Sequence, residues 1–360
     1  MEKVPSFRIL PLVQPTAERI PIDINKIKEL CAAGLSECPD EDRAIAWLIL
    51  FNVYPKVSND WNDYQEKIIK DYRVLVNDVC HLENWENVRL RPNCQKSEYN
   101  VQNQELMHLI HGDILRSGRH ICFFPNAIPM DNLSPDNSLA PFSEHMRRLE
   151  RILYVLGECN AFSYMQGFNE LICPIYFTLC KAKALFGDDM FEVEALTLQC
   201  LQYLLTATPL IEFYTTQDDS SILLHDLNQF TIVFEKHLPN EAKIMKKLDL
   251  HPLHYCYRWL NLLFGQEHEL PELLIVWDSL LSHIDDIVNF SFYVAIARIK
   301  VLSPRLNPND VAETLQVFQN REIPNIYVVL RDANNMYIQE KQGKTLTKRN
   351  VFRRRSSPYN

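Results

Sequence analysis

Two short polar segments interrupt apolar stretches of the chain, and they hold the residue types best suited to chemistry. The first covers residues 110–116, with the sequence IHGDILR. Asp113 and Arg116 are three residues apart, which places them on the same side of a helix. This spacing indicates a structural ion pair, with the arginine near the carbonyl end of the helix dipole. Arginine is also always charged, and its planar fork binds phosphate oxygens through directed hydrogen bonds.

The second polar segment covers residues 163–170, with the sequence SYMQGFNE. It lies between two strongly apolar segments, where a turn between helices is expected. In structural terms, Gly167 suits the tight position of that turn and Asn169 suits the N-cap of the next helix. Gln166 directly precedes that glycine.

Other kinds of chemical site are disfavoured. The eight glycines form no G-x-G-x-x-G, and Gly112 and Gly118 are one residue too far apart for a P-loop, whose lysine is also missing. The histidines and cysteines within 108–122 and 251–256 lack the spacing of structural zinc sites, so no metal is expected. No G-x-S-x-G elbow and no cysteine nucleophile signature occurs. A self-contained enzyme with its own nucleotide or metal is therefore unexpected.

Apolar residues recur at helical spacing along most of the chain, which predicts an all-α fold. Few glycines also argue against a chain of tight β-turns, and no internal repeat is present. Residues 83–103 and the proline-rich residues 125–141 are expected to be connections, and Gly118 is expected to end the helix that carries Arg116. Helices are predicted over 43–52, 61–80, 105–118, 144–158, 168–181, 190–205, 220–237, 254–264, 271–282, 287–301 and 308–319.

The charge is unevenly distributed. The formal net charge is −9, yet residues 341–360 contain seven Lys and Arg and no acid, so the other 340 residues carry −16. An acidic body speaks against a nucleic-acid partner. We expect the basic end to be a disordered tail, suited to peripheral contact with an anionic membrane, and its Ser356 and Ser357 to be candidates for phosphorylation.

Cysteine usage and apolar length predict a cytoplasmic location. The ten cysteines form no C-x-x-C pair, and the N-terminal residues show no apolar signal core. The stretch that looks most apolar, residues 171–180, is too short to span a membrane.

Together and in this order, the two polar segments resemble the signature motifs of the TBC domain, the helical module of Rab GTPase-activating proteins. The I-x-x-D-x-x-R motif is matched by Ile110, Asp113 and Arg116, and the Y-x-Q-G motif by Tyr164, Gln166 and Gly167, followed by Asn169. The family's opening helix and its later W-x-x-x-L-F and W-D segment are matched by Gly34, Arg43, Trp47, Trp259, Phe264, Trp277 and Asp278. The chain is similar to short family members that consist of little more than the domain, such as the branch of member thirteen.

This resemblance implies a TBC-domain fold, in which two helical lobes form a V-shaped array. Residues 1–33 would be a lead-in, residues 34–330 the domain and residues 331–360 the basic tail. The implied function is activation of GTP hydrolysis by a Rab GTPase, and hence regulation of vesicle trafficking at endomembranes. The chain would then be an activator that contributes catalytic residues in trans, rather than an enzyme by itself. It needs no cofactor of its own, because the GTP-bound Rab carries the GTP and the Mg²⁺.

The resemblance also implies a role for each matched residue. Arg116 would enter the partner's site as an arginine finger, and Gln166 would orient the attacking water as a glutamine finger. Asp113 would hold Arg116 extended. Tyr164 and Gly167 would shape the turn and Asn169 would brace it. The residues expected at the partner contact are Ile110, Ser117 and Phe168.

The sequence departs from the family pattern at two places. Ser117, Gly118 and Arg119 follow Arg116, where the family has threonine and soon a proline, although serine keeps the hydroxyl group. Phe168 stands where methionine is usual, which would alter the floor under Gln166. Two alternatives remain open: a catalytically silent TBC scaffold that binds GTP-loaded Rab or another partner, and a structural helical adaptor with no GTPase partner.

Overall fold

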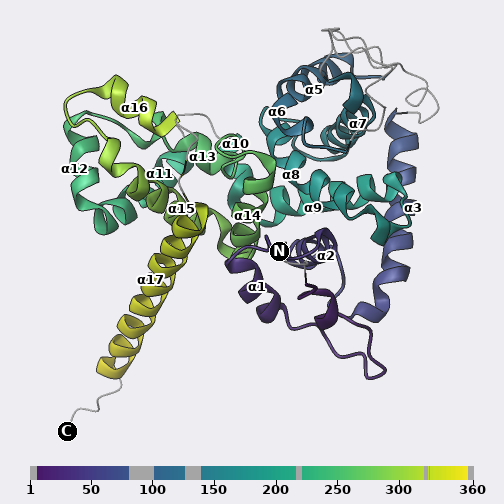
Figure 1. The fold of residues 1–360 in the computed structure, drawn as a ribbon, viewed down its shortest axis with the longest axis horizontal. Helices are drawn as coiled ribbons and strands as arrows, with labels where there is room; N and C mark the ends of the chain where they lie inside the picture. Colours follow the sequence, from purple (N-terminus) through teal and green to yellow (C-terminus); the bar gives the residue numbers. More distant parts are fainter. Residues whose placement is uncertain are drawn as a thin grey trace, which may run out of the picture.

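The computed structural model describes residues 6–80, 101–125, 139–215, 221–319, 323 and 325–355, and it is helical with no strand in these ranges (Figure 1). The all-α prediction is therefore confirmed. The predicted connections at 83–103 and 125–141 fall largely outside these ranges, and Ser356 and Ser357 fall outside them altogether.

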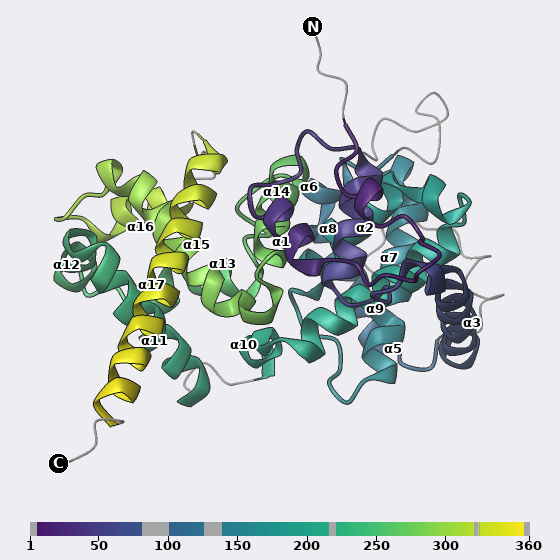
Figure 2. The same cartoon turned by 90° about the horizontal axis from the view of Figure 1, so that it is seen from below.

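The helices form two groups, seen on opposite sides of the molecule in Figures 1 and 2. The first group consists of α1 (Ile24–Ala32), α2 (Asp40–Leu50), α3 (Trp61–Cys80), α5 (Gln104–Arg116), α6 (Gly118–Ile121), α7 (Ser143–Cys159), α8 (Phe168–Lys181) and α9 (Met190–Ala207). The second consists of α10 (Glu212–Thr215), α11 (Ser221–His237), α12 (Pro239–Lys247), α13 (Tyr257–Asn261), α14 (Leu270–Leu281), α15 (Ile287–Leu302), α16 (Val311–Gln319) and α17 (Ile326–Arg355). The groups meet where α14 packs against α1, α2 and α8.

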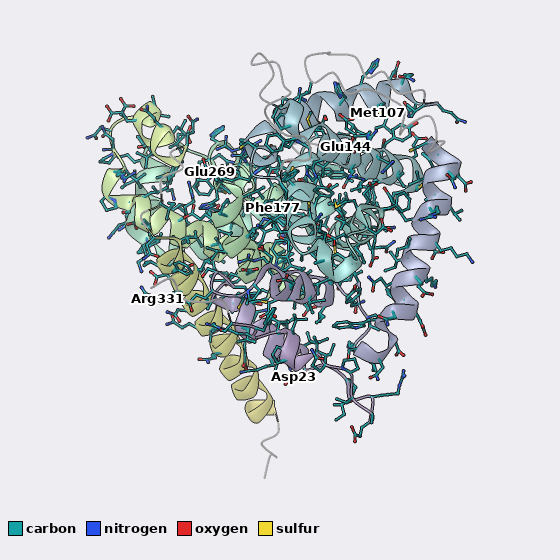
Figure 3. The ribbon with its side chains drawn as sticks, turned by 45° about the vertical axis from the view of Figure 1, so that its right-hand side comes forward. Asp23, Met107, Glu144, Phe177, Glu269 and Arg331 are labelled. Carbon is teal, nitrogen blue, oxygen red and sulfur yellow. The ribbon has the colours of Figure 1, made fainter. Side chains whose placement is uncertain are left out.

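Side chains fill the space between and within the groups. In Figure 3, Phe177 of α8 lies near the middle of the molecule, with Met107 of α5 toward one side and Arg331 of α17 toward the other. Phe177 and Met107 are buried in one continuous apolar core. Because this core runs through α8, the helix that follows the second polar segment is fixed on all sides.

A buried carboxylate joins α14 to the first group. Both carboxylate oxygens of Asp278 are used: Nε of Arg43 donates to Oδ1 at 3.1 Å, Nε1 of Trp47 donates to Oδ1 at 2.8 Å, and the amide of Leu35 donates to Oδ2 at 2.8 Å. Trp47 also stacks on Trp277, with ring centroids 5.7 Å apart. A buried carboxylate is tolerated because it has both a cation and hydrogen-bond donors.

Gly34 allows α1 to approach α14. Its φ is +86°, and a Cβ atom there would lie 2.7 Å from Cγ2 of Ile275. A side chain would meet both backbone strain and a collision. The matched family residues in the opening helix and the W-D segment therefore join α14 to the first group of helices.

The C-terminal helix corrects one expectation. Residues from 331 onward are not a disordered tail in the described part of the chain, because α17 continues to Arg355 and packs along α15. Its first turns bury Val329, Leu330 and Ala333. The Tyr337 hydroxyl group and Nζ of Lys341 both reach Asp286, at 2.8 and 2.7 Å. The burial of Ala333 and the contacts with Asp286 thus hold residues 331–341 against the rest of the protein, although the expected boundary placed them in the tail.

In the described ranges, one helical segment, Ile284–Arg305, has the length and composition to cross a membrane. It is not the stretch 171–180 that looked most apolar in the sequence. However, 72% of its most apolar window is buried inside the protein. It packs against α11, α13, α14 and α17 as a core helix does, so it is weak evidence for a membrane span.

Candidate functional site

Helix α5 delivers the first pair of site residues. Asn103 caps its N-terminus by accepting from the amide of Leu106 at 3.1 Å, and Ile110 and Ile114 bury one face. At the other end, the Asp113 side chain is 1% exposed whereas the Arg116 side chain is 61% exposed. Nη2 of Arg116 donates to Oδ1 of Asp113. A buried carboxylate thus pairs with the guanidinium group of a largely exposed side chain.

Ser117, rather than Gly118, ends α5. The Ser117 amide and hydroxyl group both donate to the carbonyl oxygen of Asp113, each at 3.1 Å. Gly118 instead begins α6. The expected glycine cap is wrong because Gly118 continues directly into the next helix and lacks the positive φ of a glycine cap.

The second polar segment forms the turn that enters α8. Gly167 is the N-cap residue with φ +110°, and a Cβ atom there would lie 2.9 Å from Cδ2 of Leu262 and 3.0 Å from Cε1 of Tyr214. Only glycine fits this position without strain. Gln166, directly before it, is exposed.

Asn169 ties the turn to α5, rather than acting as the N-cap of α8. Its Oδ1 accepts from the Gly167 amide at 3.1 Å. Its Nδ2 donates to Oγ of Ser117 at 2.8 Å and to the carbonyl oxygen of Asp113 at 3.3 Å. One buried amide therefore fixes the ends of both polar segments relative to each other.

Tyr164 anchors the carboxylate that holds the arginine. Its hydroxyl group donates to Oδ2 of Asp113 at 2.7 Å. Burial, followed by the charge of Asp113, raises the pKa of Tyr164 well above its ordinary value. The tyrosine therefore remains a hydrogen-bond donor, and both oxygens of Asp113 are occupied.

Three residues expected at the partner contact are buried. Ile110, Ser117 and Phe168 are all fully inaccessible, so the expectation of direct contact with a partner is wrong for the folded chain. Phe168 lies beneath the turn, with its ring edge-on to Tyr214 at 5.0 Å and to Tyr164 at 5.8 Å. These edge-to-face ring contacts form an aromatic floor beneath the turn.

Arg116 and Gln166 lie at one polar groove of about 470 Å³. Residues of α5, α6, the 166–167 turn and α8 line one part of it, and Arg258, Asn261, Leu262 and Gln266 line the other. The second set, together with Arg119 and Glu170, did not emerge from the sequence as site residues. These residues belong to no recognised motif in the sequence. Arg258 and Asn261 reach the groove only because α13, from the second group of helices, lies beside it.

Arg119 connects the two parts of the groove. Its Nη1 donates to the carbonyl oxygen of Gln266 at 2.8 Å, and its Nη2 lies 3.2 Å from Oε2 of Glu170. Burial alone would raise the pKa of Glu170, but the His120 ring at 3.0 Å and the Arg119 charge lower it below its ordinary value. Glu170 therefore stays ionised and keeps both partners.

One histidine of α5 and one of α6 pair with buried carboxylates. Nδ1 of His111 lies 2.7 Å from Glu150, and Nε2 of His120 lies 3.0 Å from Glu170. Within the ranges that the structure describes, no group of three or more His, Cys, Asp or Glu side chains is arranged to hold a metal ion.

The helical fold and the two joined polar segments are those expected of a TBC domain, and a comparison with known families agrees. Residues 40–306 match the Rab-GTPase-TBC domain, so this chain belongs to the TBC domain family. The match falls inside the range 34–330 that the resemblance indicated.

Named relatives and a solved structure agree with this assignment. The human TBC1 domain family member 13 is 26% identical over 195 residues, which cover 53% of this chain and 48% of the relative. The GTPase-activating protein Gyp7 of Saccharomyces cerevisiae is 23% identical over 287 residues, covering 72% of this chain and 35% of that protein. The crystal structure of the Ypt/Rab-GAP domain of Gyp1p aligns with a TM-score of 0.68 at 17% identity, covering 92% of this chain and 96% of that one. The chain thus spans about half or less of these two relatives but nearly all of the solved domain.

Proposed function

We propose that this chain activates GTP hydrolysis by a Rab GTPase, with Arg116 as an arginine finger and Gln166 as a glutamine finger. The observation that carries the proposal is their common placement: both side chains are exposed at one groove, while the groups that hold them are buried. The relatives named as GTPase-activating proteins support it further.

The proposed role of Arg116 follows from its surroundings. Negative charge builds between the β- and γ-phosphate oxygens during hydrolysis, and a guanidinium group placed there stabilises it. Asp113, fixed by Tyr164, orients the arginine before the partner arrives. Preorganisation matters because a side chain that must first be ordered loses part of its contribution.

The proposed role of Gln166 is to orient the attacking water. Its amide can accept from the water and donate to a γ-phosphate oxygen at the same time. The Gly167 turn and the Asn169 amide hold its backbone. GTP and Mg²⁺ would enter with the GTPase, and the chain would contribute no cofactor of its own.

A hydrolysis screen against a panel of Rabs loaded with GTP and Mg²⁺ tests the proposal. The unmodified chain should accelerate at least one Rab, and Arg116→Ala should remove about 10³- to 10⁵-fold of that acceleration. Arg116→Lys should also fail, because a point charge cannot reproduce the fork. Gln166→Ala should lose most of the acceleration. Unchanged stimulation by Arg116→Ala would refute the finger assignment.

The same screen separates the silent-scaffold alternative. A scaffold would bind a GTP-loaded Rab without accelerating hydrolysis, and its affinity would not depend on a transition-state mimic. An activator should instead bind the Rab more tightly when GDP and aluminium fluoride imitate the transition state.

We further propose that the chain works in the cytoplasm, peripherally at endomembranes, with the basic residues of 341–360 facing anionic lipid. The charge asymmetry between this segment and the acidic body supports such an orientation. Sedimentation with phosphatidylserine-containing vesicles tests it, and equal binding to neutral phosphatidylcholine vesicles would contradict it.

A further inference from the structure

The groove contains a second exposed arginine that is built like the first. The Arg258 side chain on α13 is 46% exposed, and the Glu267 side chain behind it is 1% exposed. Nε and Nη2 of Arg258 donate to Oε1 of Glu267 at 3.0 and 2.8 Å. As with Arg116 and Asp113, a buried carboxylate pairs with the guanidinium group of an exposed side chain that lines the groove.

The carboxylate behind Arg258 is buried and also lies near a second arginine. Oε2 of Glu267 lies 3.5 Å from Nη2 of the buried Arg298, whose guanidinium group lies 5.2 Å from the ring centroid of Trp259. Glu267 therefore lies between two arginines, one exposed and one buried. A fixed charge placed at a groove costs less to order on binding than a mobile surface side chain.

The third arginine of the groove, Arg119, is bound within the protein and does not face outward. Arg119 is less exposed and makes contacts with Glu170 and with the carbonyl oxygens of Gly265 and Gln266. Its role is to join α6 to the loop after α13. Arg116 and Arg258 are therefore the two groove arginines whose guanidinium groups face outward, one from each helical group.

We propose that Arg258 is a recognition residue that binds an acidic side chain on the surface of the GTPase. This inference rests on the proposed function. The edge of the guanidinium group formed by Nε and Nη2 is occupied by Glu267, and Nη1 makes no hydrogen bond to the described residues. A single charged donor group suits one carboxylate in a docking contact better than the many oxygens of a triphosphate.

The role predicts a pattern that differs from that of a finger. A docking contact forms equally in the ground and transition states, so its loss weakens binding and leaves the maximal rate unchanged. Because the contact pairs opposite charges near solvent, it also weakens with salt.

The test uses the full chain and the Rab that responds best in the hydrolysis screen. Affinity is measured for that Rab loaded with a non-hydrolysable GTP analogue, and single-turnover hydrolysis is measured over a range of activator concentrations. The variants are Arg116→Ala, Arg258→Ala, Arg258→Lys and a matched control, Arg8→Ala. Arg8 is 44% exposed and pairs with Glu37 at 3.0 Å, but it does not line the groove. Thermal melting verifies that each variant is folded.

Arg258→Ala should raise both the dissociation constant and the half-saturating concentration by roughly 5- to 10-fold, with the maximal rate within about twofold of the unmodified chain. Its affinity should also depend less steeply on NaCl. Arg258→Lys should recover part of the affinity, and Arg8→Ala should behave like the unmodified chain.

Three results would overturn the role of Arg258: unchanged affinity in Arg258→Ala, a lowered maximal rate at unchanged half-saturation, or weakened binding with an unchanged salt slope. The second would place Arg258 at the phosphates, and the third would reduce it to a structural residue. If the unmodified chain accelerates no Rab but binds one, the proposed activator function fails while the affinity measurement still decides the role of Arg258. If no GTP-loaded Rab binds, both proposals fall.

Discussion

The hydroxyl group of Tyr164 donates a hydrogen bond of 2.7 Å to Oδ2 of Asp113, across 51 residues of sequence. The other oxygen of the same carboxylate accepts from Arg116. The position of the exposed arginine on α5 therefore depends on a residue of the turn that presents Gln166. The two polar segments act as one unit, so a change in either should affect both.

Tyr164→Phe should reduce activity more than its effect on stability alone would suggest. The substitution removes a buried donor to a carboxylate, which should cost about 1–3 kcal/mol of unfolding free energy. Asp113 then has one fewer constraint, and we expect the maximal rate of stimulated hydrolysis to fall roughly tenfold. Urea unfolding and single-turnover hydrolysis measure the two effects.

Tyr337→Phe is the matched control for this prediction. It removes a similar bond, of 2.8 Å from a tyrosine hydroxyl group to Asp286, at the packing of α17 on α15. It should lower stability and leave the maximal rate unchanged. Equal rate losses in the two variants would show that Tyr164 acts through general stability.

Asn169→Ala should separate the two polar segments. The amide makes hydrogen bonds to the Gly167 amide, the Ser117 hydroxyl group and the Asp113 carbonyl oxygen, and its removal leaves buried polar groups unpaired. We expect a loss of roughly 2–3 kcal/mol and a lowered maximal rate. A double-mutant cycle with Ser117→Ala isolates the 2.8 Å bond and should give a coupling of at least about 0.5 kcal/mol. Additive effects would mean that this bond does not join the segments.

Gly167→Ala should strain the turn that carries Gln166. At φ +110° a Cβ atom would lie within 3.0 Å of both Leu262 and Tyr214, so strain and overpacking should together cost about 2–4 kcal/mol. Gly187→Ala is the control, because Gly187 also has a positive φ, +61°, but nothing lies within 4 Å of its Cβ position. That variant should lose about 1 kcal/mol. Similar losses at the two positions would indicate that packing against Leu262 and Tyr214 contributes nothing.

The sequence predicts best those features that depend on residues close together in the chain. Helices α3 and α8 begin and end where apolar spacing placed them, and the two polar segments were visible from their composition. The pairing of Asp113 with Arg116 also follows from helical spacing, since residues three apart share a side.

Features that depend on distant contacts escaped prediction. Arg258 carries no motif of its own, and it becomes a groove residue only because α13 packs back toward α8. Ser117 looked like a surface hydroxyl, but Asn169 covers it. The sequence placed the end of the domain at residue 330, but α17 packs on α15 beyond that point and buries Ala333. In each case tertiary packing outweighed the local signal.

A buried carboxylate far from the groove should make stability depend on pH. Glu192 in α9 is almost inaccessible, and its Oε1 has no hydrogen-bond partner within the described ranges. Burial, followed by the charge of Asp189, raises the pKa of Glu192 from 4.5 to about 7. Between these values the folded chain binds more protons than the unfolded chain. The free energy of unfolding should therefore fall as the pH rises from 4.5 to 7 and stay low above that.

Glu192→Gln should remove this dependence, because an amide of the same shape carries no charge to bury. We expect the variant to be more stable than the unmodified chain by about 1 kcal/mol near pH 8, allowing for solvent screening, with the gain shrinking as the pH falls toward 4.5. Urea unfolding at a series of pH values measures the difference. Glu18→Gln, at an exposed glutamate, should follow the unmodified chain throughout. A gain for Glu192→Gln that is the same at every pH would attribute it to packing and not to the carboxyl charge.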